Sequence, residues 1–217
     1  MAAQADPERA AGQQRYMKSA MPYYGLVTPK VREVVKTAVA EFPLPDRQAW
    51  LDAISALWDE ATHREERYAA LGVLRHRRYQ ALLIPDEVMF TLLRHLITSG
   101  AWWDLVDELA HVAGDLLATD RAVMTEVLRG WSREENLWLR RVSIISQLWA
   151  KNATDLALLD YAITGSLDDT DFFARKAIGW ALREYAKTDP DWVRDYVERR
   201  AERLSNLSRR EALKHLH

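Results

Sequence analysis

The chain has 217 residues, of which 48% are apolar and 29% are charged, a balance typical of a globular protein with a sizeable core rather than of a disordered chain. It contains no cysteine, which excludes disulfides, a cysteine nucleophile and a thiolate metal site. The net charge of −2 argues against a uniformly basic nucleic-acid coat protein, although the basic segments near both ends could form a basic face opposite an acidic one.

Apolar residues recur at three- and four-residue spacing almost throughout, which predicts an all-α chain of about twelve helices joined by short loops. Pro29 after Thr28 marks the start of one helix near the N-terminus. Further starts are indicated by three segments with capping-box spacing and by two Pro–Asp segments: "THRE" (62–65), "SREE" (132–135), "SRRE" (208–211), "PDE" (85–87) and "TDPD" (188–191).

Four predicted helices repeat at an almost constant interval. They are "EERYAALGVL" (65–74), "WWDLVDELA" (102–110), "WLRRVSIIS" (138–146) and "FARKAIGWAL" (173–182), and another helix lies between each pair: 86–97, 120–131 and 155–167. A repeated helix pair at this period is typical of a HEAT-like α-solenoid. We therefore expect residues 1–217 to form one all-α domain, a solenoid of about six HEAT-like helix pairs with a concave face.

Equivalent helices of a solenoid lie side by side, so residues one repeat apart converge. Trp103 and Asp107 are four residues apart and share a helical face. Arg141 lies one repeat further on, and Trp180 one repeat beyond that, two turns after Phe173. The spacing predicts two aromatic walls, one carboxylate and one guanidinium on one surface.

Each of these residues also has an ordinary explanation. A tryptophan in a repeat protein is most often a core residue, and an isolated Arg141 would more often form a surface salt bridge. Asp104, near the start of its helix, is expected to interact with the helix dipole and is given no catalytic role. The spacing alone therefore indicates an α-solenoid with a candidate site.

At these residues the chain resembles the AlkD-type family of DNA alkylation repair proteins, which are HEAT-like alkylpurine DNA glycosylases. The matching segments are "RYMK" (15–18), "WWDLVD" (102–107), "ENLWLRR" (135–141), "FFARKAIGWALREYAKTDPDWV" (172–193) and "LSRREALKH" (207–215). They run from near the start of the chain to its last residues. The helices between "PDRQAW" and "RRYQALL" match only weakly.

The resemblance implies a role for each matching residue. It makes Asp107 the catalytic carboxylate and places the lesion between aromatic side chains: Trp103, Trp180, Tyr16, Phe172 and Phe173. Contacts to the DNA backbone are expected from polar and basic residues in three parts of the chain: Arg141, Lys18, Thr28, Lys30 and Lys176.

This set of residues suits the chemistry of an alkylated purine. Alkylation at N3 or N7 makes the base cationic, and aromatic faces attract cations by about 0.5–2 kcal/mol. Positive charge then moves to the sugar as the glycosidic bond breaks, and a carboxylate stabilises that charge or activates the attacking water. We therefore expect a monofunctional DNA glycosylase that removes 3-methyladenine- and 7-methylguanine-type bases from duplex DNA and leaves an abasic site.

The expected enzyme needs no cofactor and no metal, because the histidines show no ligand spacing and the glycines form no phosphate loop. We expect a cytoplasmic monomer without membrane contact, since no apolar run reaches the roughly 18 residues of a membrane span and no signal-peptide pattern is present. The alternative is a non-catalytic HEAT-repeat scaffold that binds damaged DNA or a protein partner.

Overall fold

The computed structural model describes residues 1–216, and this part of the chain contains twelve α-helices and no β-strand. The prediction of an all-α chain of about twelve helices is confirmed. The described residues form two compact units, Met1–Leu83 and a second unit that begins at Ile84. The single domain and its concave face stay predictions, and residue 217 lies outside the described residues. No described helix is long and apolar enough to cross a membrane.

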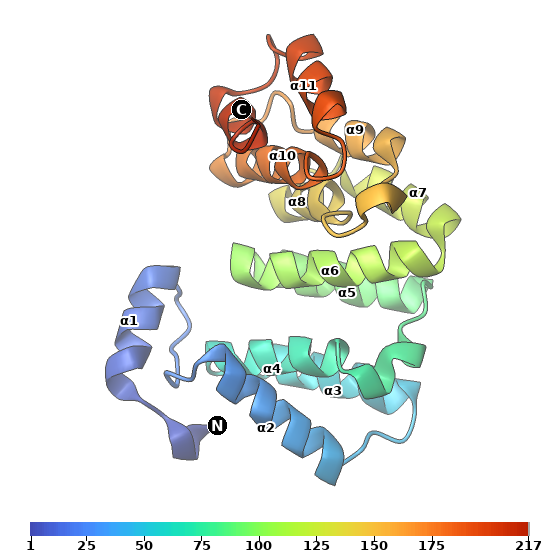
Figure 1. Ribbon diagram of the computed structural model, residues 1–217. Coiled ribbons are helices and arrows are strands. Elements are labelled where there is room, and N and C mark those ends of the chain that lie inside the picture. The colour runs from blue at the N-terminus through green and yellow to red at the C-terminus, as the bar shows by residue number, and fades with distance from the viewer. Residues whose placement is uncertain (217) are drawn as a thin grey trace. The chain divides into compact units, whose positions relative to one another are not determined.

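The first unit contains four α-helices, α1 (Pro7–Met17), α2 (Thr28–Glu41), α3 (Arg47–Asp59) and α4 (Arg64–Leu74), and two 3₁₀-helices, Ala2–Gln4 and Arg77–Leu82. Helices α3 and α4 lie side by side, and α2 also packs on α4 (Figure 1). Trp50, Ile54 and Trp58 of α3 recur at four-residue spacing and are completely buried. This apolar face of α3 forms the core of the unit.

In the second unit, most helices that follow one another along the chain pack together. Its helices are α5 (Glu87–Gly100), α6 (Trp103–Thr119), α7 (Arg121–Trp131), α8 (Leu137–Ile145), α9 (Leu156–Thr164), α10 (Phe172–Tyr185), α11 (Pro190–Arg199) and α12 (Asn206–Ala212), with a 3₁₀ turn at Lys151–Ala153. Within this unit a helix is present at each expected position, and the HEAT-like character of the repeat stays a prediction.

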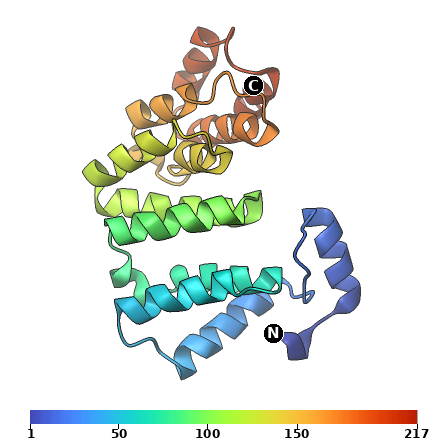
Figure 2. The same ribbon diagram turned by 180° about the vertical axis from the view of Figure 1, so that it is seen from behind.

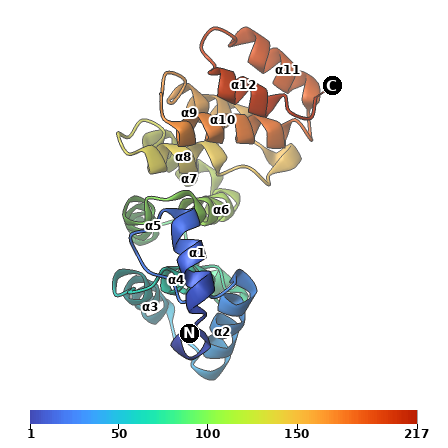
Figure 3. The same cartoon turned by 90° about the vertical axis from the view of Figure 1, so that its left-hand side faces the viewer.

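Helices α6, α8, α10 and α12 contact one another in succession and form one layer, the even-numbered row (Figure 3). Helices α5, α7 and α9 lie behind this row, and Figure 2 shows them from the other side. Helix α6 shows why the layers form. Leu105, Leu109 and Leu116 lie on its buried face and are completely covered, whereas Trp103 and Asp107 lie on another face and are half-buried.

Three of the predicted helix starts are at the expected residues. Helix α2 begins at Thr28, with Pro29 in its first turn. Asp86 caps α5 and Asp189 caps α11, each through a side-chain oxygen that accepts a backbone N–H. The predicted capping boxes at Ser132 and Ser208 are wrong. Helix α8 begins five residues after Ser132, where Asn136 caps it, and α12 is capped by Ser205 rather than by Ser208.

The capping box predicted between Thr62 and Glu65 is also wrong, by one residue. Glu66 fills this role, because its Oε2 accepts the backbone N–H groups of Thr62 at 2.6 Å and His63 at 3.0 Å. Glu65 is completely buried and points to a different partner.

That partner is the loop between α1 and α2. The Glu65 carboxylate accepts three backbone N–H groups, those of Tyr24, Gly25 and Leu26, at 2.9–3.0 Å. Helix α1 packs on the same loop, since Arg9 donates to the carbonyl of Gly25 at 3.0 Å. Gly25 has a φ of 87°, and a Cβ there would lie 2.1 Å from the carbonyl oxygen of Asp6, so this approach requires glycine. One buried carboxylate thus links α1 to α4.

Candidate active site

The candidate site is centred on an ion pair between α6 and α8. Arg141 Nε donates to one oxygen of Asp107 at 2.7 Å, and Arg141 Nη2 donates to the other oxygen at 2.9 Å. Such a bidentate pair fixes both side chains in a plane and is stronger than a single hydrogen bond. The Asp107 side chain keeps 18% of its surface exposed, whereas that of Arg141 keeps 6%. The carboxylate is therefore more accessible than the guanidinium that holds it.

Burial and charge act on Asp107 in opposite directions. Burial raises the pKa of Asp107 above its usual value, because a charged carboxylate is costly to desolvate, and Asp104 and Glu108 add to this rise. The hydrogen bonds and positive charge of Arg141 lower the same pKa but do not fully offset the burial. Asp104 itself lies in the first turn of α6, as expected for a residue that interacts with the helix dipole.

Arg141 also connects the pair to the next helix of the even-numbered row. Its Nη1 donates to the backbone carbonyl of Phe173, at the start of α10, at 2.8 Å, and its guanidinium lies 5.9 Å from the Phe173 ring centroid. Asp107, Arg141 and Phe173 therefore meet at one place although they lie on three helices. The expected convergence of these three residues is present in the structure.

An aromatic cluster lies next to the ion pair. The ring of Phe173 is 5.3 Å from that of Trp102 and 5.1 Å from that of Trp138, and the two tryptophan rings are 6.2 Å apart. Phe172 contacts the edge of this cluster and is 55% exposed. Sequence analysis did not assign a role to Trp102, which precedes α6 and whose buried Nε1–H has no acceptor among the described residues.

Trp103 and Trp180 behave differently from this cluster. Both are half-buried, and neither ring packs against another aromatic ring or a cation in the described part of the chain. Trp103 lies one turn before Asp107 on α6, and Trp180 lies two turns after Phe173 on α10. Their faces are therefore free of the ring contacts that a core tryptophan usually makes.

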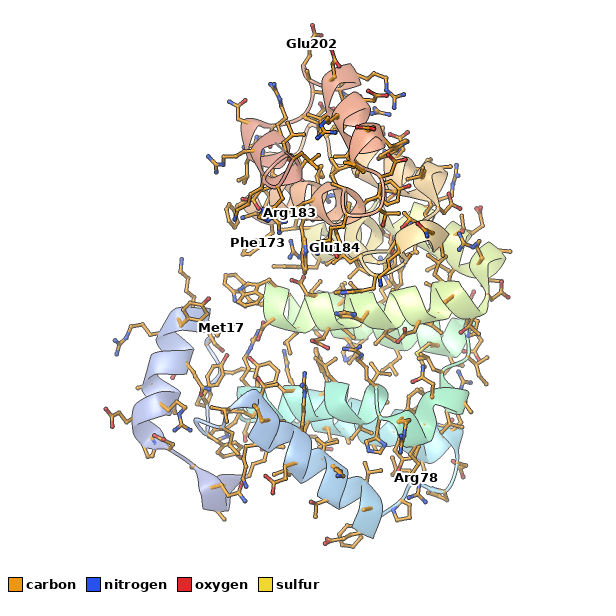
Figure 4. All side chains as sticks on the ribbon, viewed as in Figure 1. Met17, Arg78, Phe173, Arg183, Glu184 and Glu202 are labelled. Carbon is orange, nitrogen blue, oxygen red and sulfur yellow. The ribbon has the colours of Figure 1, made fainter. Side chains whose placement is uncertain are left out.

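Lys176 of α10 is held by an acidic residue that sequence analysis did not assign. Its Nζ lies 3.0 Å from Oε1 of Glu211 on α12, and the other oxygen of Glu211 accepts from Arg183. Phe173 and Arg183, both labelled in Figure 4, lie near the start and the end of α10 in sequence. Both Arg183 and Glu211 lie in segments that carry the family resemblance, and this resemblance is the sequence signal from which a role for them could have been predicted.

The remaining predicted site residues lie in the first unit. Tyr16, one residue before the labelled Met17 in Figure 4, is 77% exposed at the end of α1. Lys18 and Thr28 are exposed, and Lys30 forms an ion pair with Glu33 at 2.8 Å. Their contribution to the site in the second unit stays a prediction. The described residues contain no group of three or more His, Asp or Glu side chains placed to hold a metal ion.

Comparisons with known proteins identify the family. The sequence model of the family described as DNA alkylation repair enzyme matches residues 1–216. No curated protein matches the chain. Among solved structures, a predicted DNA alkylation repair enzyme from Enterococcus faecalis is 30% identical, with a TM-score of 0.88, over 98% of this chain and 97% of that one. The alkylpurine DNA glycosylase AlkC of Pseudomonas fluorescens, bound to DNA containing an abasic site analog, is 17% identical, with a TM-score of 0.48, over 88% of this chain and 63% of that one.

The family match spans the described chain, and the Enterococcus faecalis structure is similar over nearly its whole length. The chain therefore belongs to the DNA alkylation repair enzyme family.

Proposed function

We propose that the protein is an AlkD-type, monofunctional DNA glycosylase that acts as a monomer. Its substrates are cationic N3- and N7-alkylated purines in duplex DNA, and its products are the free base and an abasic site. The observation that carries the proposal is the Asp107–Arg141 pair, in which a partly exposed carboxylate is held rigidly next to aromatic side chains.

In this proposal Arg141 has two effects on Asp107. Its bidentate contact orients the carboxylate, and its positive charge keeps the carboxylate ionised in a site whose burial favours the protonated form. Each carboxylate oxygen has a second lone pair beyond the one directed at Arg141. Those lone pairs face the sugar and the attacking water.

The reaction needs little proton transfer to the base. The bond from the sugar C1′ to the base nitrogen breaks, its electron pair goes to the cationic purine, and the base leaves neutral. Asp107 stabilises the positive charge that develops at C1′, as a carboxylate does in other glycoside hydrolysis. A water oxygen then bonds to C1′, and its proton goes to Asp107 or to solvent.

The same site explains which bases should be released. Trp103 and Trp180 offer ring faces to a cation, and we propose that Phe172 and Phe173 extend this surface. We also propose that the exposed ring of Tyr16 contacts the lesion. Ring faces and a carboxylate recognise positive charge and provide no set of buried donors for a neutral base edge. Uracil, hypoxanthine and 8-oxoguanine should therefore remain in the DNA.

Contacts to the DNA backbone are proposed for basic and polar residues of both units: Arg141, Lys18, Thr28, Lys30 and Lys176. Three nitrogens of Arg141 already donate to protein acceptors, but each Nη carries a second N–H. These two N–H groups are the ones that we assign to a phosphate beside the lesion. Such contacts position the duplex without reading its sequence.

The proposal is tested with a duplex that contains one 7-methylguanine. The wild-type protein should release the free base, and the strand should break only after alkali treatment, because a monofunctional enzyme leaves the abasic site intact. Strand cleavage without alkali would exclude the monofunctional mechanism. Binding of the duplex without release of the base would instead identify a HEAT-repeat scaffold for damaged DNA.

A further inference from the structure

Three residues of α10 form one stripe on its surface. Lys176, Trp180 and Arg183 are spaced by four and three residues, which places their side chains on the same helical face. The two cations thus lie on either side of the half-buried Trp180 along the helix. This arrangement places positive charge before and after a ring that is available for stacking.

One carboxylate holds both cations. Glu211 of α12 accepts from Lys176 Nζ through Oε1 at 3.0 Å and from Arg183 Nη1 through Oε2. Its contacts with these cations lower the pKa of Glu211, so the carboxylate is ionised at neutral pH. The side chain of Glu211 is 11% exposed, whereas those of Lys176 and Arg183 are 37% and 23% exposed. The acid is therefore covered and the cations face outward.

A close approach between α10 and α12 places Glu211 beside Lys176 and Arg183. Gly179 lies on α10 where α12 crosses it, and a Cβ there would lie 2.5 Å from Cβ of Glu211 and 3.0 Å from the carbonyl oxygen of Ser208. Ser208 also donates to the carbonyl of Arg175 on α10 at 2.9 Å. The close approach of the two helices therefore depends on the absence of a side chain at residue 179.

Without Glu211 the two cations would not stay together. Their nitrogens both lie within contact distance of one carboxylate, and like charges at such a separation repel. Each cation uses one N–H for Glu211. Nζ of Lys176 keeps two more protons, and Nε and Nη2 of Arg183 have no acceptor among the described residues. The remaining donors are available to an external anion.

We infer that Glu211 is a positioning residue that holds Lys176 and Arg183 beside Trp180, so that both cations contact the phosphates next to an alkylated base stacked on that ring. The inference rests on the proposed function. It adds Arg183 to the expected backbone contacts and gives Glu211 a role in excision although Glu211 touches neither base nor sugar. Its effect is on geometry, because Glu211 fixes where the positive charges lie.

This role predicts a separation of binding from catalysis. Glu211→Gln removes a negative charge from a DNA-binding surface, so the affinity for undamaged duplex should stay the same or increase. The cations are no longer fixed, and single-turnover release of 7-methylguanine should fall by about ten- to hundred-fold, as expected when a bound substrate is misplaced. Glu184→Gln is the matched control, because it makes the same charge change on α10 but breaks only the pair with Lys187, 2.7 Å away. The control should change neither quantity.

The outcomes are distinguishable. Release of no base by the wild-type protein contradicts the proposed function itself. If the wild-type protein is active and Glu211→Gln is equally fast, only the positioning role is wrong. Loss of affinity, rate and urea stability together would make Glu211 a packing residue, and a gain in both affinity and rate would make it a competitor of DNA for the two cations.

A second variant keeps the test valid if Glu211→Gln does not fold. Glu211→Asp retains the charge but is one methylene shorter, so its carboxylate cannot reach both cations from the same backbone position. We expect unchanged affinity for undamaged duplex and slower release of 7-methylguanine. A wild-type rate for a folded Glu211→Asp protein would overturn the inference.

Discussion

Asp107 and Arg141 are thirty-four residues apart in sequence, yet both oxygens of the carboxylate are bonded by the guanidinium, at 2.7 and 2.9 Å. The pair forms within the protein and needs no DNA. A charge held in place before the substrate arrives stabilises a transition state without reorganisation at the moment of reaction.

Asp107→Asn keeps the size of the side chain and removes its charge. Single-turnover release of 7-methylguanine should fall by at least about ten-fold, because the developing charge on the sugar loses its counter-charge. The affinity for duplex should change little. Wild-type release by a folded Asp107→Asn protein would show that the catalytic residue lies elsewhere.

Asp107→Leu, which removes the charge and both acceptors of Arg141, should reduce stability, and this effect must be measured separately. A buried guanidinium left without its partner costs up to about 3–5 kcal/mol, and 6% exposure places Arg141 in this class. The double variant Asp107→Leu with Arg141→Met removes both charges and should recover much of the loss in urea unfolding. Its excision activity should remain as low as that of Asp107→Asn.

The pH dependence of excision should show the effect of burial on Asp107. The ionised carboxylate is the active form, and its pKa is raised, so activity should be lost on acidification at a pH above the ordinary aspartate value of 3.8. Arg141→Met removes the charge that opposes this rise, and the acid limb should therefore move to higher pH. An acid limb that does not move would show that another group controls the profile.

The stability linked to Asp107 changes with pH in the opposite sense. Because its pKa is higher in the folded protein than in the unfolded chain, the stabilising contribution is present at low pH, below the unfolded pKa. It is lost as the pH rises through the folded pKa. Urea unfolding of the wild-type protein and of Asp107→Asn across this range would measure the contribution.

The tryptophans should separate into two classes. Trp138 is 8% exposed and packs against Phe173, so Trp138→Ala should cost about 3–5 kcal/mol of folding free energy. Trp180→Ala removes a half-buried ring without aromatic neighbours and should cost less stability, while it reduces the release of cationic bases. Equal destabilisation by the two substitutions, with unchanged excision by Trp180→Ala, would make Trp180 a core residue.

Duplex affinity should depend steeply on salt although the chain has a net charge of −2. Each neutralised phosphate contributes about −0.9 to the slope of log affinity against log salt concentration. Lys18→Ala should reduce the magnitude of this slope by about 0.9, the contribution of one phosphate contact. Asp52→Asn, at an exposed position, should leave the slope unchanged. A slope near zero for the wild-type protein would contradict direct DNA binding.

The helices could be predicted from the sequence because apolar spacing reflects burial on one face of each helix. The capping residues were predicted less well than the helices. A Ser/Thr–x–x–Glu pattern takes account only of neighbouring residues, whereas a glutamate can instead bind a partner that is distant in sequence. Glu65 illustrates this difference. Its carboxylate is bonded to a loop about forty residues earlier in the chain, so the capping contact is made by Glu66.

The candidate site shows the same limit. The repeat spacing predicted that Asp107, Arg141 and Phe173 lie on neighbouring helices. In the structure Arg141 contacts both of the other residues. The spacing did not show that Arg141 would bond Asp107, because side-chain geometry across two helices determines that contact. Glu211 was missed because its partners lie on another helix and its own segment contains several charged residues.

The buried hydrogen bond between Glu65 and the backbone of Gly25 predicts which variants a genetic screen would find. A screen for variants that lose DNA binding would be expected to return residues at the protein surface. Substitutions of Glu65, although it is completely buried, should also be found in such a screen, because they release the loop on which α1 is carried and with it Tyr16 and Lys18. An allele at residue 65 would then resemble one at residue 16 or 18, and the two could be told apart because only the former also lowers the melting temperature.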